Sequence, residues 1–258
     1  MKAIREFKQY FNYAIYAAFS ELKTQVAESY LGWVWWILDP LLFMLVYSFM
    51  TVYIFKNNIE NIWLFVFIGI TVWNFFSTTI SSSIGCIRSY SSVIIKAYIP
   101  KTILVFMISI VNFIKMMISL AICIICSFLV GMDQPVYMLN LIPLLITLCI
   151  LTFGASLICA FVGVYITDFN NVMNVVLRFL FYFSGVFYRT NIFPEKILKI
   201  YNLACPSGFI ISEFRNALTL CQPINYPILL YWTVVGIVLT VLGTYLLYKK
   251  ENEYMKVI

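Results

Sequence analysis

The sequence predicts an all-α integral membrane protein with six transmembrane helices, an N-terminal interfacial helix and re-entrant external helices before the last span. Of its 258 residues, 63% are hydrophobic and only 11% are charged, and the mean hydropathy is +0.94. A soluble domain of this length could not bury so much apolar surface. The expected solvent for most of the chain is therefore lipid.

The spans are predicted from the length of the apolar runs. A helix rises 1.5 Å per residue, so about 20 apolar residues cross a hydrocarbon core of ~30 Å. Backbone groups in lipid must bond within their own segment, which favours helices here over a barrel. The six predicted spans are Ile37–Phe55, Trp63–Ile84, Thr102–Val130, Leu141–Ile166, Asn171–Tyr188 and Pro227–Tyr248.

The distribution of basic residues predicts the orientation. Eleven Lys and Arg lie before the first span, in 85–101, in 167–178 and after the last span. Five lie in the loops of the opposite side, and Lys115 falls within a span. The positive-inside rule then predicts that both termini are cytoplasmic.

Residues 1–36 form an amphipathic segment rather than a span. Aromatic side chains alternate with charged ones, as expected of helices that lie in the cytoplasmic interface. Trp33, Trp35 and Trp36 mark the level of the headgroups. They serve either as an ordinary aromatic belt or in substrate access, and the sequence leaves both open.

The loop Gly85–Lys101 is basic, rich in serine in its middle, and contains Pro100 as a helix boundary. It is either a short helix presented to a cytosolic partner or a plain basic loop. Composition alone favours the plain loop.

The external segment Arg189–Tyr226 contains two apolar patches, Ile197–Leu203 and Phe209–Leu220, each too short to cross a membrane. We expect them to form helices that dip into the outer leaflet and return, with Pro206, Ser207 and Gly208 as the turn. The alternative is a folded external loop.

The sequence offers little catalytic chemistry. It has no His, no Walker-type loop and no nucleophile elbow, and its 11 acidic residues are scattered singly. We therefore expect neither ATP hydrolysis nor a membrane transferase, which usually needs a catalytic His or a metal-binding acidic cluster. The high aromatic content permits a lining that stacks on sugar rings.

Charged residues near membrane depth are candidates for function. Asp39 precedes Pro40 and is expected to cap a helix start, while Asp168 ends the fourth span. Glu213 and Arg215 are expected to pair with neighbours or to contact solute. Lys115 is expected to be buried unless it snorkels.

The seven cysteines lie mostly in apolar runs, where Cys acts as a small hydrophobe. Only Cys205 and Cys221, in the polar external segment, are candidates for a disulfide.

Three motifs resemble a known family. The start of the first span reads Leu31-Gly32-Trp33-Val34-Trp35-Trp36-Ile37-Leu38-Asp39-Pro40-Leu41-Leu42, the fifth span ends in Phe183-Ser184-Gly185-Val186-Phe187-Tyr188, and Pro206 is followed by Glu213-x-Arg215-Asn216. Together they resemble ABC-2 type permeases that export cell-surface polysaccharides, including O-antigen and teichoic acid. The chain departs from the family at Thr167-Asp168, where Arg-Asp is frequent, and at Ser184-Gly185, where Ser-Pro is frequent.

The resemblance implies a single permease domain over residues 1–258, in a bacterial cytoplasmic membrane. It implies a half-channel that pairs with a second copy and with two separate ATP-binding subunits. Those subunits would hold ATP and Mg, so no cofactor is expected in this chain and no nucleic acid partner. The passenger would be a glycan on a polyprenyl diphosphate lipid, and a permease for drugs or small lipids is the alternative.

The resemblance also assigns roles to residues. Gly85–Lys101 would become the coupling helix seated on the ATPase, Ile4–Ala27 the interfacial gate helix, and Arg189–Leu220 the outer gate. Candidates for coupling are Arg88, Ser89, Tyr90, Lys96, Pro100, Lys101 and Asp168. Candidates for substrate access are Lys8, Lys23, Trp33, Trp35 and Trp36, joined on charge alone by Lys2 and Arg5 as contacts for a diphosphate. Candidates for the outer gate are Tyr188, Pro206, Glu213 and Arg215.

Overall fold

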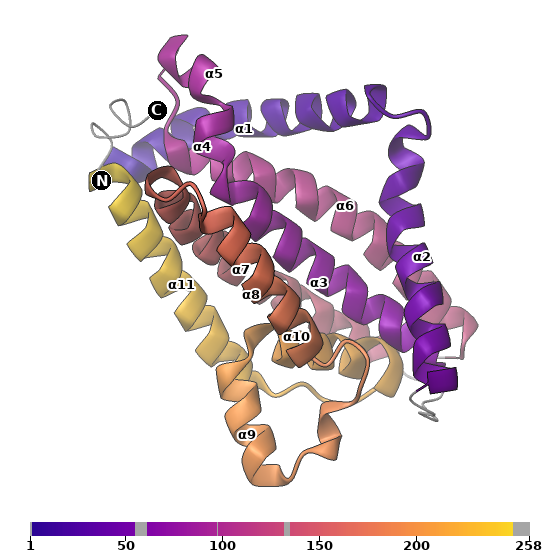
Figure 1. The fold of residues 1–258 in the computed structure, drawn as a ribbon. Helices are drawn as coiled ribbons and strands as arrows, with labels where there is room; N and C mark the ends of the chain where they lie inside the picture. The colour runs from indigo at the N-terminus through magenta and orange to yellow at the C-terminus, as the bar shows by residue number, and fades with distance from the viewer. Residues whose placement is uncertain (1, 55–60, 97, 132–134, 250–258) are drawn as a thin grey trace.

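The computed structural model describes residues 2–54, 61–96, 98–131 and 135–249. All regular secondary structure in these residues is helical (Figure 1). The α-helices are α1 (Lys2–Ala27), α2 (Trp35–Phe49), α3 (Ile62–Ile84), α4 (Cys86–Ser89), α5 (Ser91–Lys96), α6 (Lys101–Leu129), α7 (Leu141–Tyr165), α8 (Phe169–Phe183), α9 (Glu195–Ala204), α10 (Pro206–Arg215) and α11 (Tyr226–Lys249). Short 3-10 turns cover Gly32–Val34, Pro135–Asn140 and Thr190–Ile192, and π-helical turns cover Met50–Ile54 and Asn216–Leu220.

Five helical segments are long and apolar enough to cross a membrane. They are Gly32–Tyr53, Ile62–Ile84, Lys101–Leu129, Val136–Tyr165 and Tyr226–Lys249. The predicted fifth span, Asn171–Tyr188, corresponds to α8, which has 15 residues and so rises only about 22 Å. Six spans therefore stay a prediction, although an all-helical membrane protein is confirmed.

Helix α8 ends where the chain turns at Gly185. This residue has φ +71°, in the left-handed region that glycine adopts without a Cβ penalty. Proline fixes φ near −65° and could not take this conformation. The Ser-Gly pair, where the resembled family often has Ser-Pro, thus matches the local backbone.

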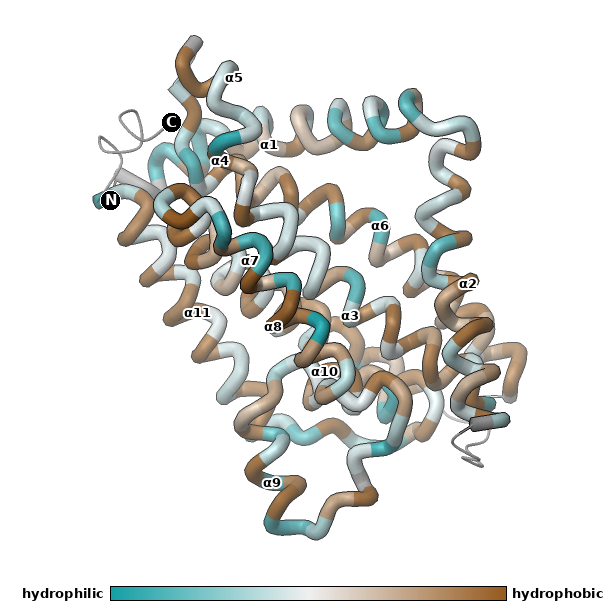
Figure 2. Tube along the Cα trace, viewed as in Figure 1, coloured by the Kyte–Doolittle hydropathy of each residue, from teal (hydrophilic) through white to brown (hydrophobic). Residues whose placement is uncertain are grey.

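Helix α3 is the central element of the bundle. Almost every residue from Leu64 to Phe76 is buried, and α3 contacts α2, α6, α7, α8 and α10. Figure 2 shows brown, apolar helices through the body of the molecule and more hydrophilic stretches along α1. A helix packed against neighbours on most of its sides is what a largely hydrophobic run predicts.

Helix α11 packs along α7 through close backbone contact. A Cβ on Gly154 would lie 2.8 Å from the Gly236 carbonyl oxygen, and a Cβ on Gly243 would lie 2.6 Å from the Leu157 Cβ. Small residues that allow such approach are typical of helix pairs in membranes.

Helix α1 lies across one end of the bundle, together with α4, α5 and the last turns of α11, while α9 lies at the other end (Figure 1). We call these the α1 end and the α9 end. Ala14, Ala18 and Leu22 of α1 are buried, and α1 packs against α6. The amphipathic helix is thus confirmed, while its place in the lipid interface stays a prediction.

The predicted loop Gly85–Lys101 contains two short helices, α4 and α5, at the α1 end. The external segment contains the expected helix pair, α9 and α10. The chain turns at Cys205, so Pro206, Ser207 and Gly208 form the first turn of α10 rather than the turn itself. Helix α10 is almost entirely buried against α3.

One smaller expectation was wrong. Asp39 does not cap a helix start, because α2 begins at Trp35 and Asp39 lies within it with its carboxylate exposed. Cys205 and Cys221, the two candidates for a disulfide, are both free thiols.

Candidate functional site

A chain of adjoining cavities runs along the face formed by α2, α3, α6 and α8. The central cavity has a volume of about 330 Å³ and lies between α2, α3 and α8. It shares Phe43 and Tyr47 with an outer cavity of about 480 Å³, and it shares Asn74 and Thr78 with an inner cavity of about 200 Å³. A loop cavity of about 280 Å³ then shares Asn112 and Lys115 with the inner one. We call these four cavities the groove.

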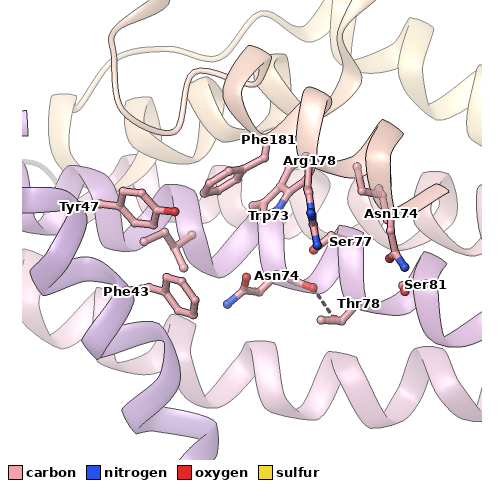
Figure 3. A pocket seen from close by; sticks show the side chains of 12 residues that line it. Phe43, Tyr47, Trp73, Asn74, Ser77, Thr78, Ser81, Asn174, Arg178 and Phe181 are labelled. Carbon is pink, nitrogen blue, oxygen red and sulfur yellow. Dashed lines mark hydrogen bonds between the residues drawn. The ribbon is translucent and has the colours of Figure 1, made fainter. Parts of the chain in front are cut away.

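The central cavity has a polar wall formed by α3. Asn74, Ser77, Thr78 and Ser81 stand at positions i, i+3, i+4 and i+7, which fall on one face of a helix. Figure 3 shows these side chains facing Arg178 and Asn174 from α8 across the cavity. A polar stripe on an otherwise apolar central helix is expensive in lipid unless it lines a wet path.

Aromatic rings surround the outer part of the groove. The Tyr47 ring centroid lies 4.4 Å from that of Phe187 and 5.7 Å from that of Phe181. Trp73 lies 5.5 Å from Phe181, so the rings of α2, α3 and α8 form one cluster. This arrangement offers flat apolar faces beside polar groups, which suits a sugar chain.

The loop cavity is lined by a hydrogen-bonded network that joins three elements. Lys115 of α6 donates from Nζ to Gln25 Oε1 of α1 at 2.7 Å. Gln25 donates in turn to Glu21 Oε1 at 3.0 Å, and the Tyr90 hydroxyl, just after α4, donates to Glu21 Oε2 at 3.0 Å. Lys115 is thus half-buried and paired, with its Nζ 5.7 Å from the Trp36 ring.

The Tyr90 hydroxyl stays protonated and donates its hydrogen bond to Glu21. Burial, together with the hydrogen bond to Glu21, raises the pKa of the Tyr90 phenol above its ordinary value. The hydroxyl therefore keeps its proton at neutral pH and holds the segment after α4 against α1.

Some of the predicted coupling residues contact the protein interior, and others are exposed. Arg88 donates from Nη2 to the Val164 carbonyl at 2.6 Å, which ties α4 to the end of α7. Pro100 and Lys101 are buried at the start of α6. Ser89 and Asp168 are exposed at the α1 end, and the side chain of Lys96 lies outside the described residues. Their role toward an ATPase stays a prediction.

The predicted access residues lie along or beside α1. Arg5, Lys8 and Lys23 are exposed on α1, and Trp33 and Trp35 are exposed at its junction with α2. Trp35 and the half-buried Trp36 both line the inner cavity, which Lys115 also lines. The side chain of Lys2 lies outside the described residues.

The predicted outer-gate residues make hydrogen bonds within the chain. Arg215 is 3% exposed, and its guanidinium donates to the carbonyls of Phe65, Gly185 and Val186 at 2.7–3.0 Å. Its Cζ also lies 3.4 Å from the Phe65 ring centroid. This cation therefore connects α10 to α3 and to the turn after α8.

Glu213 is also buried, and its Oε2 accepts from the Asn216 amide at 3.2 Å and from the backbone N–H of Asn225 at 3.4 Å. Pairing with neighbours, one of the two expected roles, is thus seen for both charges. Pro206 is half-buried as the first residue of α10, and the Tyr188 hydroxyl donates to the Phe183 carbonyl at 3.0 Å.

Neither Arg178 nor the polar stripe of α3 was predicted from the sequence as part of a site. The charge count assigned Arg178 to the inner loop, but it is the tenth residue of α8 and lines the central cavity. Without Arg178, the inner side still has ten of the counted Lys and Arg residues against five on the opposite side. The predicted orientation therefore does not change. The i, i+3, i+4, i+7 spacing of the α3 stripe was the signal that could have found this wall.

A family model described as ABC-2 type transporter matches residues 15–219. The chain belongs to the ABC-2 type transporter family. The match extends from α1 to the end of the turn after α10, and so includes every helix that lines the groove.

Similar proteins include an O-antigen export system permease protein RfbA of Klebsiella pneumoniae, which is 24% identical over 241 residues covering 92% of each chain. A protein of the same name from Myxococcus xanthus is 27% identical over 206 residues, which cover 79% of this chain and 78% of that relative. As an ABC-2 type transporter, this chain is a multi-pass transport permease, and the groove is its candidate path.

Proposed function

We propose that this chain is the transmembrane subunit of an ATP-driven exporter that moves a lipid-linked, O-antigen-type polysaccharide across a bacterial inner membrane. The relatives named as O-antigen export permeases support the cargo. The single observation that carries the proposal is the groove, because a continuous path with a polar wall and aromatic rings matches a sugar chain better than a small hydrophobic compound.

The groove is open on one side, which supports a homodimer. Leu45, Val46 and Phe49 of α2 and Val175 and Phe179 of α8 are exposed beside it. A second copy placed against these two helices would cover the apolar surface and close the groove into a channel.

The hydrogen-bonded network at the loop cavity supports coupling to separate ATPases. Two ATP-binding subunits would bind at the α1 end, where α4 and α5 lie with the last turns of α11, and this end would face the cytoplasm. Movement of α4 would pull on Glu21 through Tyr90 and so shift α1 against Lys115. ATP chemistry stays on the partner in this scheme.

The proposal is tested by blocking the groove in a strain that lacks the chromosomal copy. Ser77→Phe adds a ring to the central cavity and should lower surface glycan at least tenfold, while lipid-linked glycan accumulates on the cytoplasmic face. Val241→Phe is the control, because Val241 is an exposed residue of α11 away from the groove.

Surface glycan that stays unchanged after deletion, in a strain without a second exporter, would contradict the proposal. Stimulation of ATP turnover by small hydrophobic compounds instead of glycolipid would point to the alternative, a permease for drugs or small lipids.

A further inference from the structure

Arg178 is a cation in the middle of a short apolar helix. It lies nine residues after the start of α8, about 14 Å along a helix of about 22 Å. Its side chain is exposed and points across the central cavity toward α3 (Figure 3). A charge at this depth is costly, and such residues usually serve a substrate or ion path.

Arg178 has no anionic partner among the described residues. Among the residues that the structure describes, no hydrogen bond or ion pair engages its guanidinium. Asp39 lines the inner and outer cavities but not the central one, and Glu213 is bound to Asn216 and Asn225. Arg215, in contrast, donates hydrogen bonds to three carbonyl groups.

The groups around Arg178 complete a receptor for an oxyanion. Asn174, one turn earlier on α8, presents an amide to the same cavity, and Asn74 and Ser77 face them from α3. These neutral side chains can donate hydrogen bonds, while a guanidinium binds phosphate or carboxylate through two parallel bonds. Within the described part of the chain, the cavity thus combines the cation of Arg178 with neutral donors, and no carboxylate lines it.

We propose that Arg178 binds an anionic phosphate or carboxylate group of the passenger as it passes through the central cavity. This inference rests on the proposed function and deepens it, because it adds charge selection to a groove otherwise suited to neutral sugars. The anion has two possible sources, the diphosphate of the lipid carrier or an acidic group on the glycan itself.

The test measures binding to the full-length permease in lipid nanodiscs. The probes are geranylgeranyl diphosphate, geranylgeraniol, inorganic diphosphate, and a neutral and a uronate-containing oligosaccharide. Arg178→Gln should weaken binding of the anionic probe about ten- to a hundredfold, as expected for a lost charge-assisted hydrogen bond. Arg178→Lys should retain most of it, and binding of geranylgeraniol and the neutral oligosaccharide should not change.

The pattern of probes identifies the source. A loss confined to the lipid diphosphate assigns Arg178 to the carrier, and a loss confined to the uronate oligosaccharide assigns it to the glycan. Lys249→Gln is the matched control, because it removes one positive charge from an exposed position at the end of α11, outside the groove. It should leave all binding unchanged.

Unchanged anion binding in Arg178→Gln would overturn the inference. The same holds if Arg178→Gln binds anions normally but no longer forms dimers, because Arg178 would then act in the dimer contact. In both cases wild-type binding of the lipid-linked probes would leave the proposed function standing. If the wild type bound neither lipid-linked nor oligosaccharide probes, the proposed function itself would fail.

Discussion

Arg215 and Arg178 show how one residue type serves opposite purposes. Arg215 is buried and fully engaged by carbonyls and a ring, so it fixes the position of α10. Arg178 is exposed to the groove and unengaged among the described residues. Burial and partners, rather than charge, separate a structural cation from one available to a passenger.

Gly69 provides a direct test of the Arg215 site. A Cβ at this position would lie 2.6 Å from Nη2 of Arg215 and 3.4 Å from a Val186 methyl carbon. Gly69→Ala should therefore destabilise the protein by about 1–3 kcal/mol, the usual cost of overpacking, measured as a lower Tm in detergent. Gly85→Ala is the control, since nothing lies within 4 Å of a Cβ there, and equal Tm values for the two variants would refute the tight contact.

The roles of Arg215 and Arg178 could be predicted from the sequence to different extents. The motif around Arg215 marked it as important, but only the fold shows that its partners are carbonyls 29 to 150 residues away. Arg178 was counted with the inner loop 167–178, although the predicted fifth span, Asn171–Tyr188, also contains it. Side-chain partners across a bundle depend on packing that no local pattern records.

At the scale of elements, prediction from the sequence succeeded because lipid makes helix length a strict requirement. The third span was predicted as Thr102–Val130 and α6 covers Lys101–Leu129, and the fourth was predicted as Leu141–Ile166 and α7 covers Leu141–Tyr165. The turn positions were less certain: the break between α9 and α10 falls at Cys205 rather than at Pro206–Gly208. A proline fits the first turn of a helix as well as a loop.

The link between α1 and the segment after α4 can be tested by removing one hydroxyl. Tyr90→Phe deletes the hydrogen bond to Glu21, which should weaken the contact by about 0.5–1.5 kcal/mol and lower glycan export per ATP hydrolysed several-fold. The measurement is export and ATP turnover of the same purified complex, with Glu21→Gln expected to behave similarly. The control is Tyr16→Phe, which alters an exposed tyrosine of α1.

If Tyr90→Phe lowered ATP turnover and export in equal proportion, the hydroxyl would act on assembly or stability and not on coupling. An unchanged ratio in both variants would remove the network from the mechanism.

At the scale of the whole molecule, we propose that the groove is a half-path that a second copy completes. Leu45 of α2 is 60% exposed beside the groove, and Val238 of α11 is 54% exposed on a face away from it. Leu45→Trp should shift the purified permease from dimer toward monomer by crowding the α2 face. Val238→Trp should not change the mass measured by light scattering, and a dimer lost only in Val238→Trp would place the interface on α11.

The whole-molecule account depends on movement of a lipid-linked polysaccharide through this chain. The direct measurement reconstitutes the permease with its ATPase in proteoliposomes and follows a labelled lipid-linked glycan by its protection from an added glycosidase. The account predicts ATP-dependent movement of the glycan across the bilayer, reduced at least tenfold by Ser77→Phe and unaffected by Val241→Phe. ATP hydrolysis without glycan movement, or movement that Ser77→Phe leaves intact, would contradict it.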